Sequence, residues 1–214
     1  MQTPQPPLDH RGDPFRRGAR DGLGLSAWHI VICGFTQGIG RRTGSHTLWM
    51  ALNQSLSDAK TAVLLYPWHS RWSDVAEMVA VSSDTAGPPK ICVYAYSWGA
   101  GYGFVQLAKQ LRRRGLSIDQ AVLCDPVYKS PLWSLAWLSL VHQWLGLAIH
   151  VPANVRHVQH FFQRRNVPRG AALVARSPLT HIDEGAELDR NHGWMSEAAE
   201  YQSLCKRVAR ESKS

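Results

Sequence analysis

A serine, an aspartate and two late histidines stand in this chain in an order that could support nucleophilic catalysis. Ser97 and Asp125 each follow or end an apolar run, and His181 and His192 come later. A serine attacks a carbonyl group when a base takes its proton, a carboxylate orients that base, and hydrogen-bond donors stabilise the oxyanion. These residue types therefore predict acyl-group chemistry with Ser97 as the nucleophile.

Ser97 lies where a predicted strand turns directly into a predicted helix. Residues 91–96 are apolar and rich in β-forming types, and residues 105–114 have a helical pattern. Ala95 and Gly99 stand two positions before and after the serine. Small neighbours relieve the crowding of such a sharp turn, which would lift the serine hydroxyl to the carboxyl edge of a sheet. A tight connection, or a phosphate-binding loop with an incidental serine, is the plainer alternative.

Asp125 is the predicted acid because it ends the apolar run 120–125, where functional groups of a parallel sheet gather. As part of an Asp-Pro pair it could instead form a turn or cap a helix. Asp183 and Asp189 are the alternative acids.

The predicted base is His192, which lies between Asn191 and Gly193 in a segment able to turn sharply before the final helix. His181 competes with it, but it stands in a short β-prone segment, where its ring would more easily be fixed in the sheet. Without the serine turn, a surface position would be the better explanation of either histidine.

The oxyanion hole requires two backbone amides. Trp98 supplies one candidate, because its amide would stand at a helix N-terminus directly after the nucleophile. Phe35 supplies the other, from the glycine-rich loop that follows the first strand.

Apolar runs alternate with helical patterns through the first two thirds of the chain. Four apolar strands separated by helices predict an α/β fold, with a mostly parallel central sheet covered by helices on both faces. The expected strands are 28–33, 62–66, 91–96, 120–125 and 152–162, with weaker ones at 171–175 and 180–182, and the expected helices are 45–56, 75–81, 105–114 and 197–210.

These features resemble the α/β-hydrolase superfamily, in particular small hydrolases of bacteria and their phages that are similar to lipases and serine esterases. The resemblance rests on residues 96–100, 124–128 and 192–195, and on residues 152–155, 162–163 and 168–170 around the late strand. It implies the α/β-hydrolase fold and a serine esterase acting through Ser97, His192, Asp125 and an acyl-enzyme. Ala95 departs from the usual glycine, and the acid stands one strand earlier than in most hydrolases, as in pancreatic-type lipases.

Residues 131–149 are tryptophan-rich and apolar, with one helical face that holds Trp133 and Trp137. Polar residues interrupt the stretch, which favours a cap over the site, or a core helix, over a membrane span. We expect Trp133 and Trp137 to bind the acyl part of a small-molecule ester. The stretch also leaves open a weak contact with a membrane or lipid surface.

Length and composition indicate one domain over residues 25–214, which the resemblance identifies as an α/β-hydrolase domain, preceded by a flexible basic tail over residues 1–24. The chain has 214 residues, of which 44% are hydrophobic and 19% charged. Its net charge of +8 comes from dispersed arginines, so no nucleic-acid groove is expected. No export signal is visible, which favours the cytoplasm. Cys33, Cys92 and Cys124 lie in strand-like runs as buried free thiols.

Other ligands are disfavoured. The glycine loop at 34–44 lacks the third glycine of a dinucleotide fingerprint, because Thr43 stands there, and it lacks the lysine of a phosphate-binding loop. His157 and His160 stand three apart on a predicted strand, so their rings would point to opposite faces and not hold a metal. We therefore expect no metal and no organic cofactor.

The predicted function is hydrolysis of carboxylic esters. Acyl transfer to another alcohol and amidase activity would use the same residues, and a binding protein could keep the scaffold without turnover. The sequence leaves the natural ester and the oligomeric state open.

Overall fold

The computed structural model describes residues 24–35, 37, 42–56, 58–84, 86–127 and 147–212. The predicted tail lies outside the described residues except for Gly24, and so do residues 131–146 of the predicted cap.

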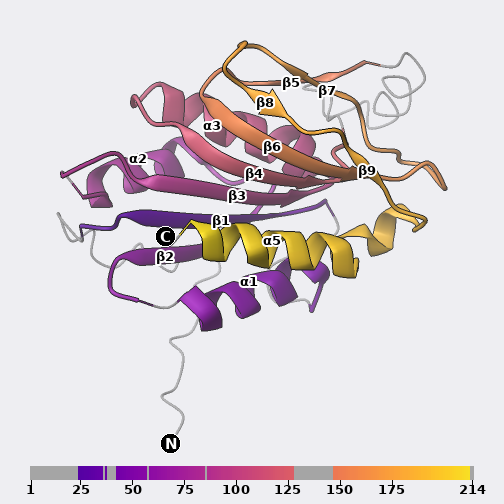
Figure 1. Cartoon of the computed structure of the whole chain (residues 1–214), viewed down its shortest axis with the longest axis horizontal. Coiled ribbons are helices and arrows are strands. Elements are labelled where there is room, and N and C mark those ends of the chain that lie inside the picture. Colours follow the sequence, from indigo (N-terminus) through magenta and orange to yellow (C-terminus); the bar gives the residue numbers. More distant parts are fainter. Residues whose placement is uncertain are drawn as a thin grey trace, which may run out of the picture.

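A parallel sheet forms the middle layer of the described part of the chain (Figure 1). Its strands are β1 (Ala27–Cys33), β2 (Thr61–Pro67), β3 (Lys90–Tyr96), β4 (Ile118–Cys124), β6 (Val155–Phe162), β8 (His181–Ile182) and β9 (Ala186–Glu187). The order across the sheet is β2-β1-β3-β4-β6-β8, with β9 also paired to β6. Every recorded pairing is parallel, so the carboxyl ends of β1, β3 and β4 meet at one edge.

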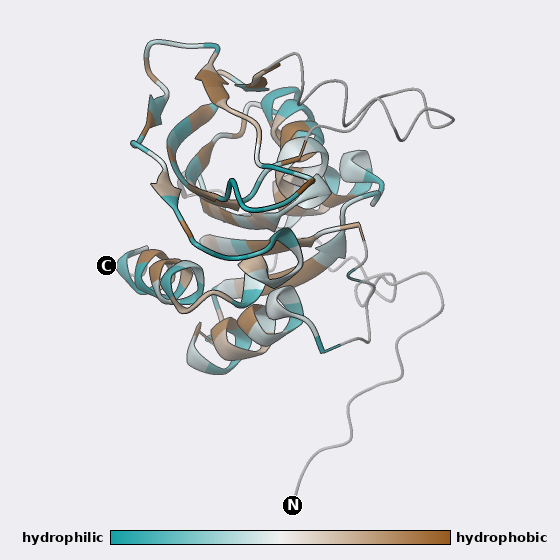
Figure 2. Ribbon diagram, turned by 90° about the vertical axis from the view of Figure 1, so that its right-hand side faces the viewer, coloured by the Kyte–Doolittle hydropathy of each residue, from teal (hydrophilic) through white to brown (hydrophobic). Residues whose placement is uncertain are grey.

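Helices cover both faces of this sheet. The pair α1 (Gly44–Leu56) and α5 (Ala199–Glu211) lies on one face, and α2 (Trp72–Ser82) and α3 (Phe104–Arg112) lie on the other (Figure 1). Along β1, Ile30 and Ile32 pack into the core beneath α2 and α3, whereas Val31 packs toward α1 and α5. Figure 2 shows the resulting concentration of hydrophobic residues on the central strands. Burial of both faces explains why these strands read as unbroken apolar runs. The predicted fold class is confirmed.

The first departure from the prediction in the second half of the chain is at Ile149. Ile149, predicted to end the apolar helix, instead lies in β5 (Ile149–Val151). This strand pairs with β7 (Leu173–Ala175) in a separate two-stranded sheet. Ile149 and Val151 are buried while His150 between them is exposed. That alternation is typical of a strand covered on one face. The sequence did not predict this strand because Ile149 ends a long apolar stretch whose length favours a helix.

The last helix begins later than predicted, at Ala199 rather than residue 197. A 3₁₀ helix, η3 (His192–Glu197), precedes it and starts at the predicted base. None of the helices in the described ranges is long and apolar enough to cross a membrane. Cys33, Cys92 and Cys124 are buried free thiols on β1, β3 and β4, as predicted.

Candidate active site

Ser97 occupies a strained turn between β3 and the following helix. Its φ angle is +55°, in the left-handed region that serine seldom adopts. Close packing fixes this turn: a methyl group on Gly99 would lie 2.6 Å from the carbonyl oxygen of Cys33 and 2.7 Å from that of Ile32. Only glycine at position 99 allows the chain after the serine to pass so close to β1.

The helix after Ser97 begins differently from the prediction. Its first residues form a π-helix, η1 (Gly99–Gly103), before α3 starts at Phe104. The amide of Phe104 bonds the carbonyl of Gly99, five residues back. Gly101 is required in this segment because a methyl group there would overlap the carbonyl of Val127. Gly99 and Gly101 therefore let this segment pass close to β1 and to Val127.

The structure brings Ser97, His192 and Asp125 together. Ser97 Oγ lies 2.9 Å from His192 Nε2, and His192 Nδ1 lies 2.5 Å from Asp125 Oδ2. With Nδ1 carrying a proton that it donates to the carboxylate, Nε2 holds a lone pair that faces the serine hydroxyl. Asp125 is fully buried, and the side chain of His192 is only 13% exposed. This linear arrangement can move a proton away from the serine.

Asp125 is held in place by the end of β6 and by the residues that follow it. Its φ angle is +45°, and its amide bonds the carbonyl of Phe161. Gln163 donates to the carboxylate twice, from its backbone amide to Oδ1 at 3.2 Å and from Nε2 to Oδ2 at 3.1 Å. Gly170 leaves room for the carboxylate, since a methyl group there would lie 2.5 Å from Oδ1. These donors compensate the buried negative charge.

His192 is positioned from two sides. Its backbone amide donates to Asn166 Oδ1 at 2.7 Å, and its carbonyl accepts from the Tyr96 hydroxyl at 2.6 Å. The Tyr96 ring also stacks on the imidazole, with centroids 5.1 Å apart. Burial raises the pKa of the Tyr96 phenol, so it stays protonated and remains a donor. The base is therefore fixed through both its backbone and its ring.

The two residues predicted for the oxyanion hole lie side by side. The rings of Phe35 and Trp98 contact each other at 4.3 Å between centroids, and both pack against Trp68. Phe35 follows β1 and Trp98 follows the nucleophile, so both stand at the carboxyl edge. The structure thus brings these two residues together at the edge where Ser97 lies.

A buried polar network ties the loop after β1 to the segment that carries His192. Gln37 Oε1 accepts from the Ser45 hydroxyl at 2.6 Å, and Gln37 Nε2 donates to the Ser196 hydroxyl at 2.7 Å. Gln202 Nε2 in turn donates to the carbonyls of Gly44 and Ser196. The loop predicted to supply an oxyanion donor is therefore anchored to η3.

The alternative acids and base lie elsewhere. His181 contacts Asp183 at 2.8 Å on the sheet edge, and Asp189 pairs with Arg165 at the surface. Buried cysteines offer no competing nucleophile in the described part of the chain: burial raises the pKa of Cys33 to about 12 and that of Cys92 to about 11. At neutral pH these two groups stay thiols, and the thiolate is the reactive form.

Trp133 and Trp137, predicted to bind substrate, lie outside the described residues. Conversely, sequence reasoning missed the roles of Gln163, Asn166 and Trp68. Gln163 stands directly after β6, at the same carboxyl edge as the acid, and that position was the available signal. Nothing in the spacing of the chain indicated which side chain would face it.

No protein-family model matches this sequence, and no curated protein matches it. Among solved structures, the chain is similar to the RedJ thioesterase from the prodiginine biosynthetic pathway of Streptomyces coelicolor, with 12% identity, coverage of 94% of this chain and 92% of that chain, and a TM-score of 0.48. It is also similar to mouse alpha/beta hydrolase domain-containing protein 10, with 10% identity, coverage of 86% and 88%, and a TM-score of 0.48. An esterase from Pyrobaculum calidifontis has 17% identity, coverage of 91% and 78%, and a TM-score of 0.47.

The strand order, the helices on both faces and the strained serine turn at the carboxyl edge together define the architecture of the described residues. They confirm the predicted α/β class, with a parallel sheet covered by helices on both faces, and the resemblance to the α/β-hydrolase superfamily stays a prediction that agrees with it.

Proposed function

We propose that this protein is a serine hydrolase that cleaves carboxylic esters through an acyl-enzyme on Ser97. The observation that carries the proposal is the continuous hydrogen-bonded line from the Ser97 hydroxyl through both nitrogens of His192 to the buried Asp125 carboxylate. A hydroxyl, a base and an orienting carboxylate in such a line are what nucleophilic acyl chemistry requires.

In the first half of the reaction, His192 Nε2 takes the proton of Ser97 as its oxygen attacks the ester carbonyl carbon. The tetrahedral intermediate carries an oxyanion, which the amides of Phe35 and Trp98 would stabilise. The intermediate collapses when the carbon–oxygen bond to the alcohol breaks and the imidazolium returns its proton to the leaving oxygen. The products of this half are the free alcohol and the acyl group bonded to Ser97.

The second half repeats the same steps with water. His192 takes a proton from water, the hydroxide attacks the acyl carbon, and the acid leaves as Ser97 recovers its proton. The role of Asp125 in both halves is to accept from Nδ1 and stabilise the imidazolium. Donors from Gln163 support this carboxylate in both halves.

The aromatic residues beside Ser97 favour an apolar acyl group. Phe35 is 54% exposed next to Trp98 and Trp68, so it offers apolar surface at the reacting group. Each methylene buried against such surface contributes about 0.8 kcal/mol of binding. We expect kcat/KM for p-nitrophenyl esters to rise from acetate to medium-length chains. A steady fall from acetate onward would mean that these rings do not bind the acyl chain.

The test of the catalytic proposal is labelling with a fluorophosphonate probe followed by peptide mapping. The folded protein should be modified at Ser97, and labelling should be lost in Ser97→Ala but kept in Ser73→Ala, which changes an exposed serine on α2. Heat-denatured protein should not react, because the probe needs the activated hydroxyl. If the folded protein is not labelled, the chain is better described as a binding protein built on a hydrolase scaffold.

A further inference from the structure

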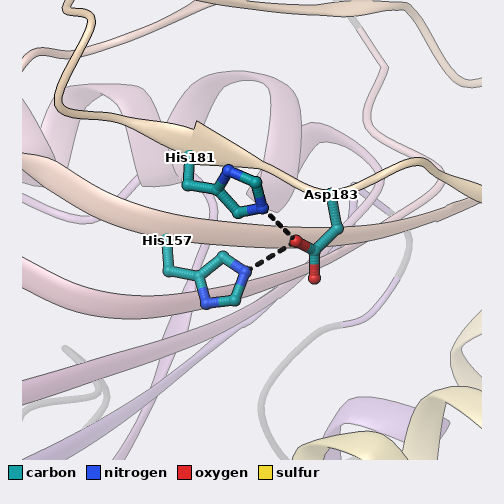
Figure 3. Close-up of side chains that lie close together, drawn as sticks. All are labelled: His157, His181 and Asp183. Carbon is teal, nitrogen blue, oxygen red and sulfur yellow. Dashed lines mark hydrogen bonds and ion pairs between the residues drawn. The ribbon is translucent and has the colours of Figure 1, made fainter.

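Two histidines and an aspartate converge at the edge of the sheet, away from Ser97. His157 on β6 and His181 on β8 are register partners in a parallel pairing, and Asp183 stands two residues after His181. Register partners present their side chains to the same face, and Asp183, just past the end of β8, keeps the alternation of that strand because its amide still bonds β6. Figure 3 shows both imidazoles and the carboxylate turned toward one another.

The three side chains offer their ligand atoms at nearly the spacing of a metal site. Nε2 of His157 and Nε2 of His181 each lie 2.8 Å from Asp183 Oδ1, and the three atoms lie within 4.8 Å of one another. Zinc bonds of about 2.0–2.1 Å place tetrahedral ligands about 3.3 Å apart. An opening of roughly half an ångström at the carboxylate would therefore admit the ion. The His181 side chain is 73% exposed and is free to make that movement.

The backbone already holds these ligands in place. Beyond the register of β6 and β8, the Asp183 amide donates to the carbonyl of Val158 at 2.9 Å, so the carboxylate is anchored to the strand that carries His157. A site mounted on paired strands needs little rearrangement to bind, because the main chain sets the separation of its ligands.

The chemistry of the donor set selects the kind of ion. Two imidazole nitrogens and one carboxylate oxygen suit zinc and neighbouring divalent transition metals, whereas calcium and magnesium prefer oxygen ligands alone. We propose that His157, His181 and Asp183 bind one divalent transition-metal cation, with Zn²⁺ as the reference ion and the remaining coordination position open to solvent.

This site differs from the pair His157 and His160, for which the sequence predicted no metal binding. His160, three residues after His157, packs instead against Gly185 and the ring of Phe162. The second imidazole belongs to His181 on the neighbouring strand, 24 positions after His157 in the sequence. Spacing along one strand could not reveal a site that is assembled across two.

A bound cation would join β6 to a very short edge strand. β8 has two residues, and the chain continues from it through β9 to His192. Because the site needs the paired strands to exist, binding favours the folded state and should raise the melting temperature. The site is independent of the ester chemistry proposed for Ser97.

The test uses the full chain without an affinity tag, titrated with Co²⁺ by visible absorption and with Zn²⁺ by calorimetry. We expect one ion per chain, with affinity lowered about tenfold or more in His157→Ala, His181→Ala and Asp183→Asn. His150→Ala removes an exposed histidine on β5 in the other sheet and should leave binding unchanged. His192→Ala should also bind as the parent does.

Three results would overturn the proposal. These are no binding of either ion by the folded parent, unchanged affinity in both His157→Ala and His181→Ala, or loss of binding in His192→Ala with retention in His181→Ala. Circular dichroism checks that each variant is folded. Since the His181 side chain is largely exposed, its removal opens no core cavity, and the experiment stays decisive if another variant misfolds.

Discussion

Two histidine–aspartate clusters occupy the described part of this sheet, and they use the same residue types in different geometries. At the carboxyl edge, Asp125 accepts from one nitrogen of His192 while the other nitrogen faces Ser97. At the sheet edge, Asp183 receives two imidazole nitrogens on a single oxygen. A line of groups can transfer a proton along itself, whereas groups that converge on one point can surround an ion.

The surroundings of the two carboxylates differ as much as their geometry. Asp125 is fully buried and accepts from Gln163, so its field acts on His192 with little screening by water. The Asp183 side chain is 36% exposed. Water screens its charge, and solvent can supply the further ligands that a metal needs. Burial therefore suits the first cluster to catalysis, and exposure suits the second to reversible binding.

The largest expected difference between the clusters is in kcat after each one's histidine is replaced. His192→Ala should lower kcat for a p-nitrophenyl ester by roughly 10⁴-fold to 10⁶-fold, because Ser97 loses its proton acceptor. His181→Ala should retain the parent rate, with thermal melting confirming that both variants are folded. Turnover by His192→Ala together with an inactive His181→Ala would reverse the assignment of the base.

The next largest difference in kcat is expected between variants of the two aspartates. Asp125→Asn should lower kcat by about 10⁴-fold, because an amide no longer accepts from Nδ1 and the imidazole takes the wrong tautomer. Asp183→Asn is the matched control and should change kcat less than twofold by the same assay, since that residue does not contact His192 in the structure. Equal losses in both variants would show that the distinction between the clusters is wrong.

A smaller effect is expected from the residue that supports the acid. Gln163→Leu removes the Nε2 donor to Asp125 and should lower kcat about 10-fold to 100-fold, with a loss of about 1–3 kcal/mol in the free energy of unfolding. The control is Gln159→Leu, which changes a half-buried glutamine on β6, the strand that Gln163 follows. Assays well below the melting temperature separate a misplaced Asp125 from a loss of folded protein. An unchanged kcat would show that Gln163 does not position Asp125 for catalysis.

The smallest effect is expected at Tyr96. Tyr96→Phe keeps the ring that stacks on His192 but loses the hydroxyl bond to its carbonyl, and should lower kcat about threefold to tenfold. Tyr94→Phe on the same strand loses a hydroxyl contact with His29 and serves as the control. Chemical denaturation should show comparable destabilisation in both variants, whereas only the change at Tyr96 should slow ester turnover. If Tyr96→Phe and Tyr94→Phe turn over ester at the same rate, the Tyr96 hydroxyl contributes to stability only.

The sequence by itself determined the local elements and the residues at their ends. Apolar runs predicted β1 to β4 within a few residues, and the small neighbours of Ser97 predicted its turn, because periodicity and glycine geometry act within one element. The sequence also predicted that Asp125 lies at a strand end and that His192 precedes the last helix. Their catalytic roles are proposals, but their proximity in space follows from the parallel strand order.

The tertiary structure alone decided which distant side chains meet. Gln163 faces Asp125 across 38 positions of sequence, and His157 meets His181 only because β6 and β8 pair in that register. A shift of one residue in a strand pairing would turn the same side chains to opposite faces, and no spacing along the chain specifies that register. Partners within an element could therefore be read from the sequence, whereas partners across elements depended on how the strands were ordered and aligned.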